Sequence, residues 1–213
     1  MIPFVLVIIA IISYLLGSFN GAIITSRLKF RQDVRNYGSG NAGLTNFHRK
    51  YGKKSVLMVV AIDVIKGIVA GLIGGLLMGF LGYPTVGKIF AGFCVMLGHS
   101  YPVFFGFRGG KGVLTGVSML FVVDFRIACI ALIIFGCVVA FTRYVSLGAM
   151  VGSAAAPICV WAFEYGGLEG VLMLFCWLLL VFQHRSNIGR LITGTESKLR
   201  FGKTAEEKLK ENF

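Results

Sequence analysis

Long apolar runs, separated by short polar segments, dominate the chain. The runs occupy seven stretches, at 3–26, 55–81, 84–105, 111–124, 126–142, 145–163 and 168–184. A helix that crosses a bilayer needs roughly 20 mostly apolar residues, with a lower limit of about 17. Only 111–124 falls below that limit, so it is either a tilted or partial helix or half of a re-entrant pair. The pattern predicts an all-α, polytopic membrane helix bundle with about seven membrane-spanning segments, or five if the short run and its neighbour are re-entrant.

The composition agrees with lipid as the surrounding solvent. Hydrophobic residues make up 56% of the chain and charged residues only 14%, whereas soluble domains carry about 25% charged residues. The first run has no basic start and no small-residue cleavage site, so we interpret it as a retained span rather than a signal peptide. The five cysteines all lie within apolar runs and form no Cys-x-x-Cys pair. We therefore predict no metal site, no disulfide and no cofactor.

Basic residues predict the orientation. If the N-terminus lies outside, the inner loops and the C-terminal segment contain all of the 21 lysines and arginines except Lys66, Lys88 and Arg126. Because short cytoplasmic loops are enriched in Lys and Arg, we expect the N-terminus outside and the C-terminus in the cytoplasm. Residues 1–198 are expected to form a single membrane-embedded domain, followed by a basic cytoplasmic tail at 199–213.

The run 55–81 carries two features inside the membrane. Small residues recur at every fourth position, a spacing that lets helix backbones approach closely in lipid, and 145–163 repeats the pattern. Asp63 and Lys66, three residues apart, can pair with each other, either as a structural ion pair or as the floor of an active site. The two stripes consist of Gly67, Gly71, Gly75 and Gly79, and of Gly148, Gly152 and Ala156.

The first inner polar segment, 38–49, reads GSGNAGLTNFHR. Its glycines can expose backbone N–H groups, its serine, threonine and asparagines supply neutral donors, and its arginine can bind phosphate bidentately. The alternative is an ordinary turn before the next helix, but a bare turn rarely needs so many residues of this kind. We favour a phosphate site. The candidate ligands are Ser39, Asn41, Thr45, Asn46 and Arg49.

The second segment, 98–115, reads GHSYPVFFGFRGGKGVLT. Three glycines surround Lys111 directly before a new helix, which suits an anion at a positive helix N-terminus. A flexible basic hairpin at the lipid surface is the alternative. The segment is not a Walker A loop, because Phe105 stands where Gly is required and Gly112 where Ser or Thr is required. A nucleotide triphosphatase is therefore disfavoured.

The third segment, 184–198, reads HRSNIGRLITGTESK. His184, Asn187 and Arg190 recur every three residues, so they share one face if the last apolar helix continues through them. We expect the residues on this face to have a functional role at the site. For Arg185 and the more distal lysines we prefer a simpler role, the attraction of anionic lipid headgroups.

The positions of the carboxylates and histidines, and the absence of an evident repeat, disfavour several functions. The few, scattered carboxylates argue against a two-metal phosphotransferase that acts on CDP-alcohols. None of the three histidines starts an HxxxxD motif of the soluble-type glycerolipid acyltransferases. An anion or lipid transporter remains the alternative, but it would show a polar midplane site and two matching halves. Apart from Asp63 and Lys66, the chain has little polarity at depth and no evident repeat.

Together the three segments resemble the three motifs of the bacterial acyl-phosphate:glycerol-3-phosphate acyltransferases, the PlsY family. The resemblance runs from about residue 14 to 198 in the expected order, and it includes TRYVS at 142–146. Asn20, Arg108 and Ser197 depart from the usual Pro, Lys and Pro. Arginine in place of lysine keeps the charge but changes its geometry.

The resemblance implies transfer of a fatty acyl group from acyl phosphate to the 1-hydroxyl of sn-glycerol 3-phosphate. The products would be lysophosphatidic acid and phosphate, in the first step of phospholipid synthesis. Acyl phosphate, glycerol 3-phosphate and membrane lipid are the implied partners, with no nucleic acid. The implied location is the bacterial cytoplasmic (inner) membrane, with the site facing the cytoplasm and an acyl-phosphate-producing enzyme as a candidate for handover of the donor.

The expected catalytic residues are His184, Asn187, Ser39 and Lys111. Phosphate is a good leaving group, so direct transfer needs no covalent acyl-enzyme. His184 is the favoured general base, with His99 or the substrate's own phosphate as alternatives, and Asn187 or backbone N–H groups would stabilise the oxyanion. Lys111 and its neighbouring glycines would hold the phosphate of one substrate, and segment 38–49 would hold the phosphate of the other. The sequence leaves open which substrate binds to which segment. The remaining expected binding residues are His99, Arg108, Gly109, Gly110, Gly112, Thr115, Arg143, Arg190 and Glu196.

Overall fold

The computed structural model describes residues 1–53 and 55–199, and these residues form helices and loops with no β-strand among them. Each of the seven apolar runs is helical, which confirms the predicted all-α bundle. The helices are α1 (Ile2–Ser18), α2 (Gly21–Phe30), α3 (Leu44–Tyr51), α4 (Val56–Gly79), α5 (Pro84–Ser100), α6 (Val113–Val123), α7 (Phe125–Thr142), α8 (Val145–Ala162), α9 (Gly167–Gln183) and α10 (Arg185–Ile192), with short 3-10 turns at Val34–Asn36 and Val103–Phe105.

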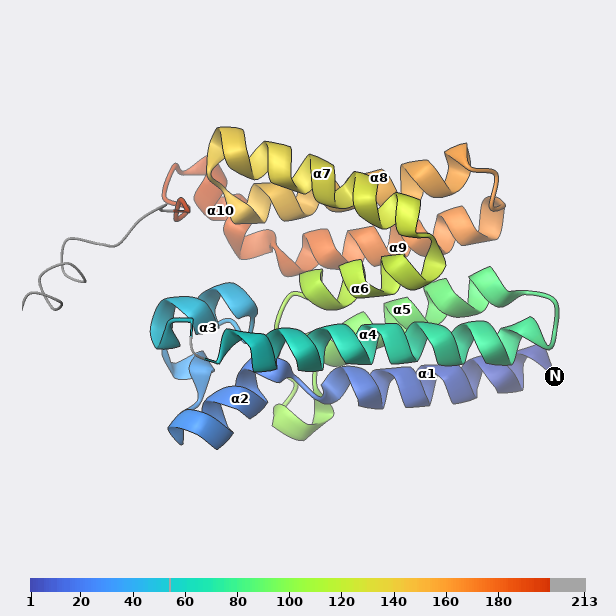
Figure 1. Cartoon of the computed structure of the whole chain (residues 1–213), viewed down its shortest axis with the longest axis horizontal. Helices are drawn as coiled ribbons and strands as arrows, with labels where there is room; N and C mark the ends of the chain where they lie inside the picture. Colours follow the sequence, from blue (N-terminus) through green and yellow to red (C-terminus); the bar gives the residue numbers. More distant parts are fainter. Residues whose placement is uncertain (54, 200–213) are drawn as a thin grey trace, which may run out of the picture.

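The long helices form two groups with a short helix between them (Figure 1). In one group α1, α4 and α5 pack against one another. In the other, α8 packs against both α7 and α9. The short helix α6 contacts α4, α5 and α7, and α5 also contacts α9. The loop that leads into α6 therefore delivers its residues to the junction between the two groups.

The helix lengths agree with a membrane-embedded chain. Five helical segments of the described residues are long and apolar enough to cross a membrane, and a sixth qualifies if α9 and α10, which meet at 58°, form one bent span. With 11 residues, α6 is only about 16 Å long, which is far short of a hydrocarbon core of about 30 Å. This length fits a partial helix, which is one of the alternatives given for 111–124, and the alternatives are not decided by length alone.

The sidedness and the number of spans stay predictions, as does the assignment of 1–198 to a single domain. Of the expected basic tail at 199–213, all but Leu199 lies outside the described residues.

Small residues bring neighbouring helices together, as the two stripes predicted. A Cβ atom on Gly67 in α4 would meet the Oγ of Ser118 and the carbonyl oxygen of Thr115, both in α6. A Cβ on Gly152 in α8 would lie 2.7 Å from the carbonyl oxygen of Ala131 in α7. The glycines are therefore required by packing and leave no room for a side chain.

The first apolar run is broken into two helices at Phe19 and Asn20. The Asn20 side chain caps α2, because its Oδ1 accepts a hydrogen bond from the backbone N–H of Ile23 at 3.1 Å. Its Nδ2 donates to the carbonyl oxygen of Ala42 at 3.1 Å. The buried Asn20 side chain thus caps the start of α2 after the break and links it to the polar segment at 38–49.

The predicted pairing of Asp63 with Lys66 is confirmed, and the pair belongs to a larger buried cluster. Lys66 Nζ lies 2.7 Å from Asp63 Oδ1. The same Nζ donates to the carbonyl oxygens of Gly17 at 3.1 Å and Phe19 at 3.0 Å, and Asp63 accepts from the backbone N–H of Gly21 at 3.1 Å. The ion pair therefore satisfies backbone groups that the break between α1 and α2 leaves without helical partners.

Replacing Gly67 by Ala should destabilise the bundle, because the new methyl group would overlap Ser118 and the carbonyl group of Thr115. Overpacking of this kind costs about 1–3 kcal/mol. The matched control is Gly136→Ala in α7, where an added Cβ meets nothing within 4 Å. Thermal unfolding in detergent micelles should show a lower midpoint for Gly67→Ala alone, and equal midpoints for the two variants would contradict the packing.

Candidate active site

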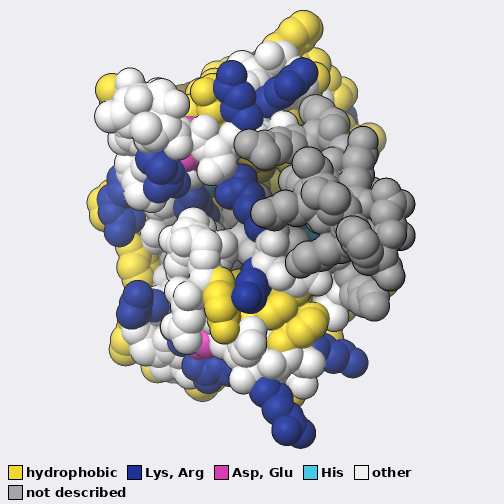
Figure 2. All heavy atoms as spheres, turned by 90° about the vertical axis from the view of Figure 1, so that its left-hand side faces the viewer, with side chains coloured by type: hydrophobic (Ala, Val, Ile, Leu, Met, Phe, Trp, Pro, Cys, Tyr) yellow, Lys and Arg dark blue, Asp and Glu magenta, His cyan; other side chains and the backbone are white. Residues whose placement is uncertain are grey.

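The three polar segments meet at one end of the bundle. The N-terminus lies at the opposite end, while α2, α3 and α10 gather where the segments lie (Figure 1). Figure 2 shows this end face, over which lysine and arginine side chains are spread. A single cavity of about 870 Å³ opens among the three segments and continues into the bundle. Segments that are distant in the sequence therefore build one site.

Asn46 organises the first segment. Its side chain is 4% exposed, and its Nδ2 donates to the carbonyl oxygens of Val34 at 3.2 Å, Tyr37 at 3.0 Å and Asn41 at 3.1 Å. Its Oδ1 accepts from the backbone N–H of Ser39 at 3.1 Å. The amide lines the cavity, yet all of these bonds go to its own loop. The structure thus gives Asn46 a positioning role for the residues around it.

The other candidates of the first segment present polar groups to the cavity. Ser39, Asn41, Thr45 and Arg49 all line it. Within the described ranges 1–53 and 55–199, their side chains make no hydrogen bond to protein. Two hydroxyls, an amide and a guanidinium therefore remain available to a ligand, and this is the donor set that a phosphate requires.

Gly109 and Gly110 do not form the N–H cradle that the sequence suggested. The N–H of Gly109 donates to the carbonyl oxygen of Ser100 at 3.0 Å, and that of Gly110 to the carbonyl oxygen of His99 at 3.1 Å. A Cβ on Gly110 would collide with the His99 ring. These glycines are needed for close packing, which holds the following residue, Lys111, at the cavity.

The open N–H groups lie one step further on, at the start of α6. Gly112 caps the helix in a left-handed conformation, φ 78°, which glycine adopts without strain. The first N–H groups of a helix lack partners within the helix, and Val113 and Leu114 line the cavity beside Lys111. An anion site at this helix N-terminus stays a prediction, and the residues whose N–H groups are open to it follow the glycine pair.

Lys111 and Asn187 join the second segment to the third. The Lys111 Nζ donates to the Asn187 Oδ1. Burial lowers the pKa of Lys111 to about 8, and the positive charges of Arg190 and Arg49 act in the same direction while Glu196 opposes them. The ammonium group is therefore a poorly solvated cation with few counter-charges, which favours the binding of an anion.

Glu196 is the centre of a second set of contacts. Its Oε1 accepts from the Ser146 hydroxyl at 2.7 Å and from the Asn187 Nδ2 at 2.6 Å, and its Oε2 accepts from the Arg190 Nε at 2.7 Å. Although burial raises the pKa of this carboxyl, these three hydrogen bonds hold it below its usual range. Ionised Glu196 thereby fixes both Asn187 and Arg190. Sequence reasoning placed Ser146 in a motif but missed its role here.

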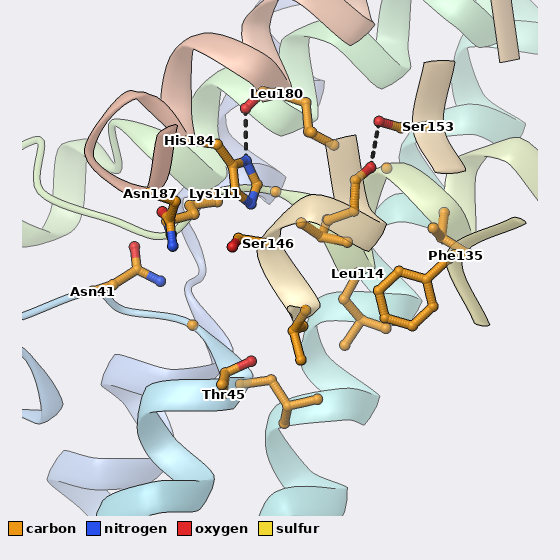
Figure 3. A pocket seen from close by; sticks show the side chains of 18 of the residues that line it. Asn41, Thr45, Lys111, Leu114, Phe135, Ser146, Ser153, Leu180, His184 and Asn187 are labelled. Carbon is orange, nitrogen blue, oxygen red and sulfur yellow. Dashed lines mark hydrogen bonds between the residues drawn. The ribbon is translucent and has the colours of Figure 1, made fainter. Parts of the chain in front are cut away.

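His184 lies at the bend between α9 and α10. The condition that the last apolar helix continues straight through this segment is not met, because the chain turns by 58° at this point. The bend still brings the His184 ring beside Lys111, Asn187 and Ser146 (Figure 3). The His184 Nδ1 lies 2.8 Å from the carbonyl oxygen of Leu180. A carbonyl only accepts, so Nδ1 carries the hydrogen and Nε2 of the neutral ring is left as an acceptor.

His99 has the opposite arrangement. Its Nδ1 lies 2.8 Å from the Lys66 Nζ. An ammonium group only donates, so Nδ1 accepts and the hydrogen of the neutral ring is on Nε2. His99 is 4% exposed and packs under Gly110. The geometry thus separates the two candidate bases, since His184 offers a free acceptor nitrogen and His99 offers a donor.

Several predicted binding residues lie away from the cavity. Arg108 and Arg143 are exposed, and their backbone carbonyls accept hydrogen bonds from the Arg35 side chain and the Leu199 N–H. Thr115 is fully buried and faces the α4 packing contact. None of the three lines the cavity, which leaves their predicted contacts with substrate without support from this geometry.

The inner part of the cavity is apolar. It extends between α6, α7, α8 and α9, and Figure 3 shows Leu114, Phe135 and Leu180 projecting into it beyond the polar mouth. Sequence reasoning did not locate this interior, because its wall combines single faces of four helices. A polar mouth over an apolar interior fits a ligand with an anionic head and a hydrocarbon tail.

Comparison with known proteins agrees with this geometry. Residues 7–194 match the family described as glycerol-3-phosphate acyltransferase. The glycerol-3-phosphate acyltransferase of Thermoanaerobacter pseudethanolicus is 45% identical over 193 residues, which cover 91% of this chain and 95% of that protein. The protein of the same name from Clostridioides difficile is 39% identical over 195 residues, with coverage of 91% and 95%.

Two solved structures share the fold. Both are of PlsY, an integral membrane glycerol 3-phosphate acyltransferase. Its glycerol 3-phosphate form has a TM-score of 0.82 at 33% identity and covers 98% of each chain. Its lysophosphatidic acid form has a TM-score of 0.79 at 32% identity and covers 96% of this chain and 98% of that one.

Binding of glycerol 3-phosphate should weaken as the pH rises through about 8, the pKa of Lys111. Lysine is charged below its pKa, so the cation is lost on the alkaline side. Between about pH 7 and pH 9.5 a phosphate monoester stays dianionic, because its second pKa is about 6. Isothermal titration calorimetry in this range should show the decline for the wild type. Lys111→Arg, which stays charged, should bind with little pH dependence; a parallel decline in that variant would contradict the assignment.

Proposed function

Because the chain belongs to the glycerol-3-phosphate acyltransferase family, we propose that it uses acyl phosphate as the acyl donor. In this reaction the 1-hydroxyl oxygen of sn-glycerol 3-phosphate attacks the acyl carbonyl carbon. The bond between that carbon and the phosphate oxygen breaks, so lysophosphatidic acid and inorganic phosphate are formed. The observation that carries the proposal is the continuity of the cationic, hydroxyl-rich mouth with an apolar interior in one cavity.

The donor chemistry suits the residues at the mouth. Acyl phosphate is already activated, so the site needs no nucleophilic side chain to form an acyl-enzyme. Two phosphates must be held side by side, and Lys111 and Arg49 are two cations that line the same cavity. Fixing the hydroxyl near the carbonyl removes much of the entropic part of the barrier. The acyl chain would occupy the apolar interior while the mixed anhydride stays at the mouth.

Charge that develops on the carbonyl oxygen would be stabilised at the same place. The Asn187 amide is held by Glu196 on one side and by Lys111 on the other, and Lys111 itself is a cation. The first N–H groups of α6 have no partners within the helix, and they belong to residues, Val113 and Leu114, that line the same cavity. A preorganised donor of this type contributes about 2.7–4 kcal/mol in other acyl-transfer enzymes.

The hydrogen-bond geometry supports His184 as the general base. Its Nδ1 donates to the carbonyl oxygen of Leu180. Its Nε2 makes no hydrogen bond to any residue that the structure describes, so it can accept the proton of the attacking hydroxyl. His99 would have to accept at an Nε2 that already carries a hydrogen. The phosphate of the substrate is the remaining alternative, since the leaving phosphate could take up the same proton.

We further propose that the site faces the cytoplasm of a bacterial cell, from the inner membrane. The lysines and arginines of 27–53 and 185–198 are at the site end of the bundle, and the N-terminus is at the other end (Figure 1). Short cytoplasmic loops carry this excess of positive charge. Both substrates carry a charged phosphate group, which favours contact with water. An enzyme that makes acyl phosphate could transfer the donor to the site at this face.

The donor can be identified with purified protein in lipid nanodiscs. Acyl phosphate and glycerol 3-phosphate should yield lysophosphatidic acid and inorganic phosphate in equal amounts, because each transfer releases one of each. Acyl-CoA with the same chain should give no product. Mass spectrometry of the lipid and a colorimetric phosphate assay measure the two products. Product formation from acyl-CoA and not from acyl phosphate would refute the proposed donor.

Replacing His184 by Gln should lower kcat by about 10²–10⁴-fold, because a general base contributes a factor of that size. KM for glycerol 3-phosphate should change little, since the amide remains polar. The matched control is His48→Gln, which alters an exposed histidine that does not line the cavity. Steady-state kinetics at saturating acyl phosphate measure the effect. Normal turnover in His184→Gln would exclude this base and leave the substrate's phosphate in that role.

A further inference from the structure

The apolar interior of the cavity ends at the same depth on three helices. On α8 the deepest lining residue is Ala156, eleven residues beyond Val145 at the start of the helix. On α7 it is Ala131, eleven residues before Thr142. On α9 it is Met173, eleven residues before His184. At 1.5 Å per residue each of these distances is about 16 Å along its own helix, and we call the three residues together the floor of the cavity.

The floor is closed from below by packed side chains. One helical turn beyond Ala131 and Ala156 lie Ile127 and Val160, both fully buried in the same hydrophobic cluster. Met173 is 1% exposed and belongs to that cluster too. A hydrocarbon chain that reaches this level cannot continue straight on, because the interior beyond it is filled.

We propose that Ala131, Ala156 and Met173 set the longest acyl chain that the site accepts. The inference rests on the proposed function in one respect, namely that an acyl chain occupies the apolar interior. With carbon–carbon bonds of about 1.5 Å, an extended chain advances roughly 1.25 Å per carbon, so the cavity holds roughly 13 carbons above the floor. Two of the three floor residues are alanines, and their small size gives the cavity its depth.

A larger side chain at the floor should shorten the preferred chain. In Ala156→Leu, three added carbons fill the deepest part of the cavity. Rejection of one excess methylene by a hydrophobic pocket is worth about 10- to 200-fold. For the longest acyl phosphate that the wild type uses well, kcat/KM should fall by at least about tenfold. Short acyl phosphates, which do not reach the floor, should be used as before.

A matched variant separates this effect from a general disturbance of α8. Ala154 lies two residues before Ala156 on the same helix and lines a second groove with Ile158 and Trp161, which shares only Trp177 with the cavity. Ala154→Leu adds the same carbons outside the cavity, and its chain-length profile should equal that of the wild type. Met173→Ala removes bulk from the floor and should shift the profile to longer chains, opposite to Ala156→Leu.

The experiment measures kcat/KM for a series of saturated acyl phosphates, from eight to eighteen carbons, with wild type and the three variants in nanodiscs. Opposite shifts for Ala156→Leu and Met173→Ala, with no shift for Ala154→Leu, support the floor. An unchanged profile in Ala156→Leu, an equal loss at every length, or an equal shift in Ala154→Leu overturns it. If Ala156→Leu does not yield monodisperse protein, the absence of a shift in Met173→Ala overturns it.

The donor experiment and the chain-length experiment can fail independently of each other. If the wild type uses acyl-CoA and not acyl phosphate, the proposed donor is wrong, and the same series made with acyl-CoA gives the same three outcomes for the floor. The chain-length profile is a ratio within each variant, so it does not depend on which leaving group carries the acyl chain.

Discussion

A buried ion pair within one helix is the constraint on which the site depends. Lys66 binds Asp63 and also the two carbonyl groups left open where α1 breaks into α2. An unpaired charge in the membrane interior and an unsatisfied backbone group are each costly. Here the carbonyl groups at the break help to solvate the Lys66 ammonium group, and the ammonium group satisfies the carbonyl groups. The break and the ion pair therefore stabilise one arrangement of α1, α2 and α4.

The same cluster reaches the reacting groups through His99. Lys66 donates to its Nδ1, and the ring supports the glycine pair at 109–110, whose N–H groups are bound by the end of α5. The next residue is Lys111, which continues the chain of contacts to Asn187 and Glu196. A continuous series of polar contacts thus runs from the α1–α2 break to the mouth of the cavity, where it includes Lys111, Asn187 and Glu196.

Much of this protein could be predicted from local patterns. Apolar runs identified every long helix, because the bilayer demands a minimum apolar length. The four-residue glycine spacing identified the packing faces, because it places small residues on one side of a helix. Lys111, Asn187, Arg49 and His184 were recognised as candidates by residue type, and all four line the cavity. The bend at His184 was missed, because no proline or glycine marks it in the sequence.

The sequence by itself determined that the chain is a lipid-embedded helical bundle with three phosphate-suited polar segments, since these properties follow from residue type and short-range spacing. Only the tertiary structure decided which of the candidate residues meet in the cavity and which partners they contact. It bound the Asn46 amide to its own loop and left Arg108 exposed and outside the cavity lining. It also assigned opposite hydrogen positions to His99 and His184 and joined Ser146 to Glu196. The physical reason is that each of these depends on partners far apart in the chain, and so does the cavity floor, which three helices complete together.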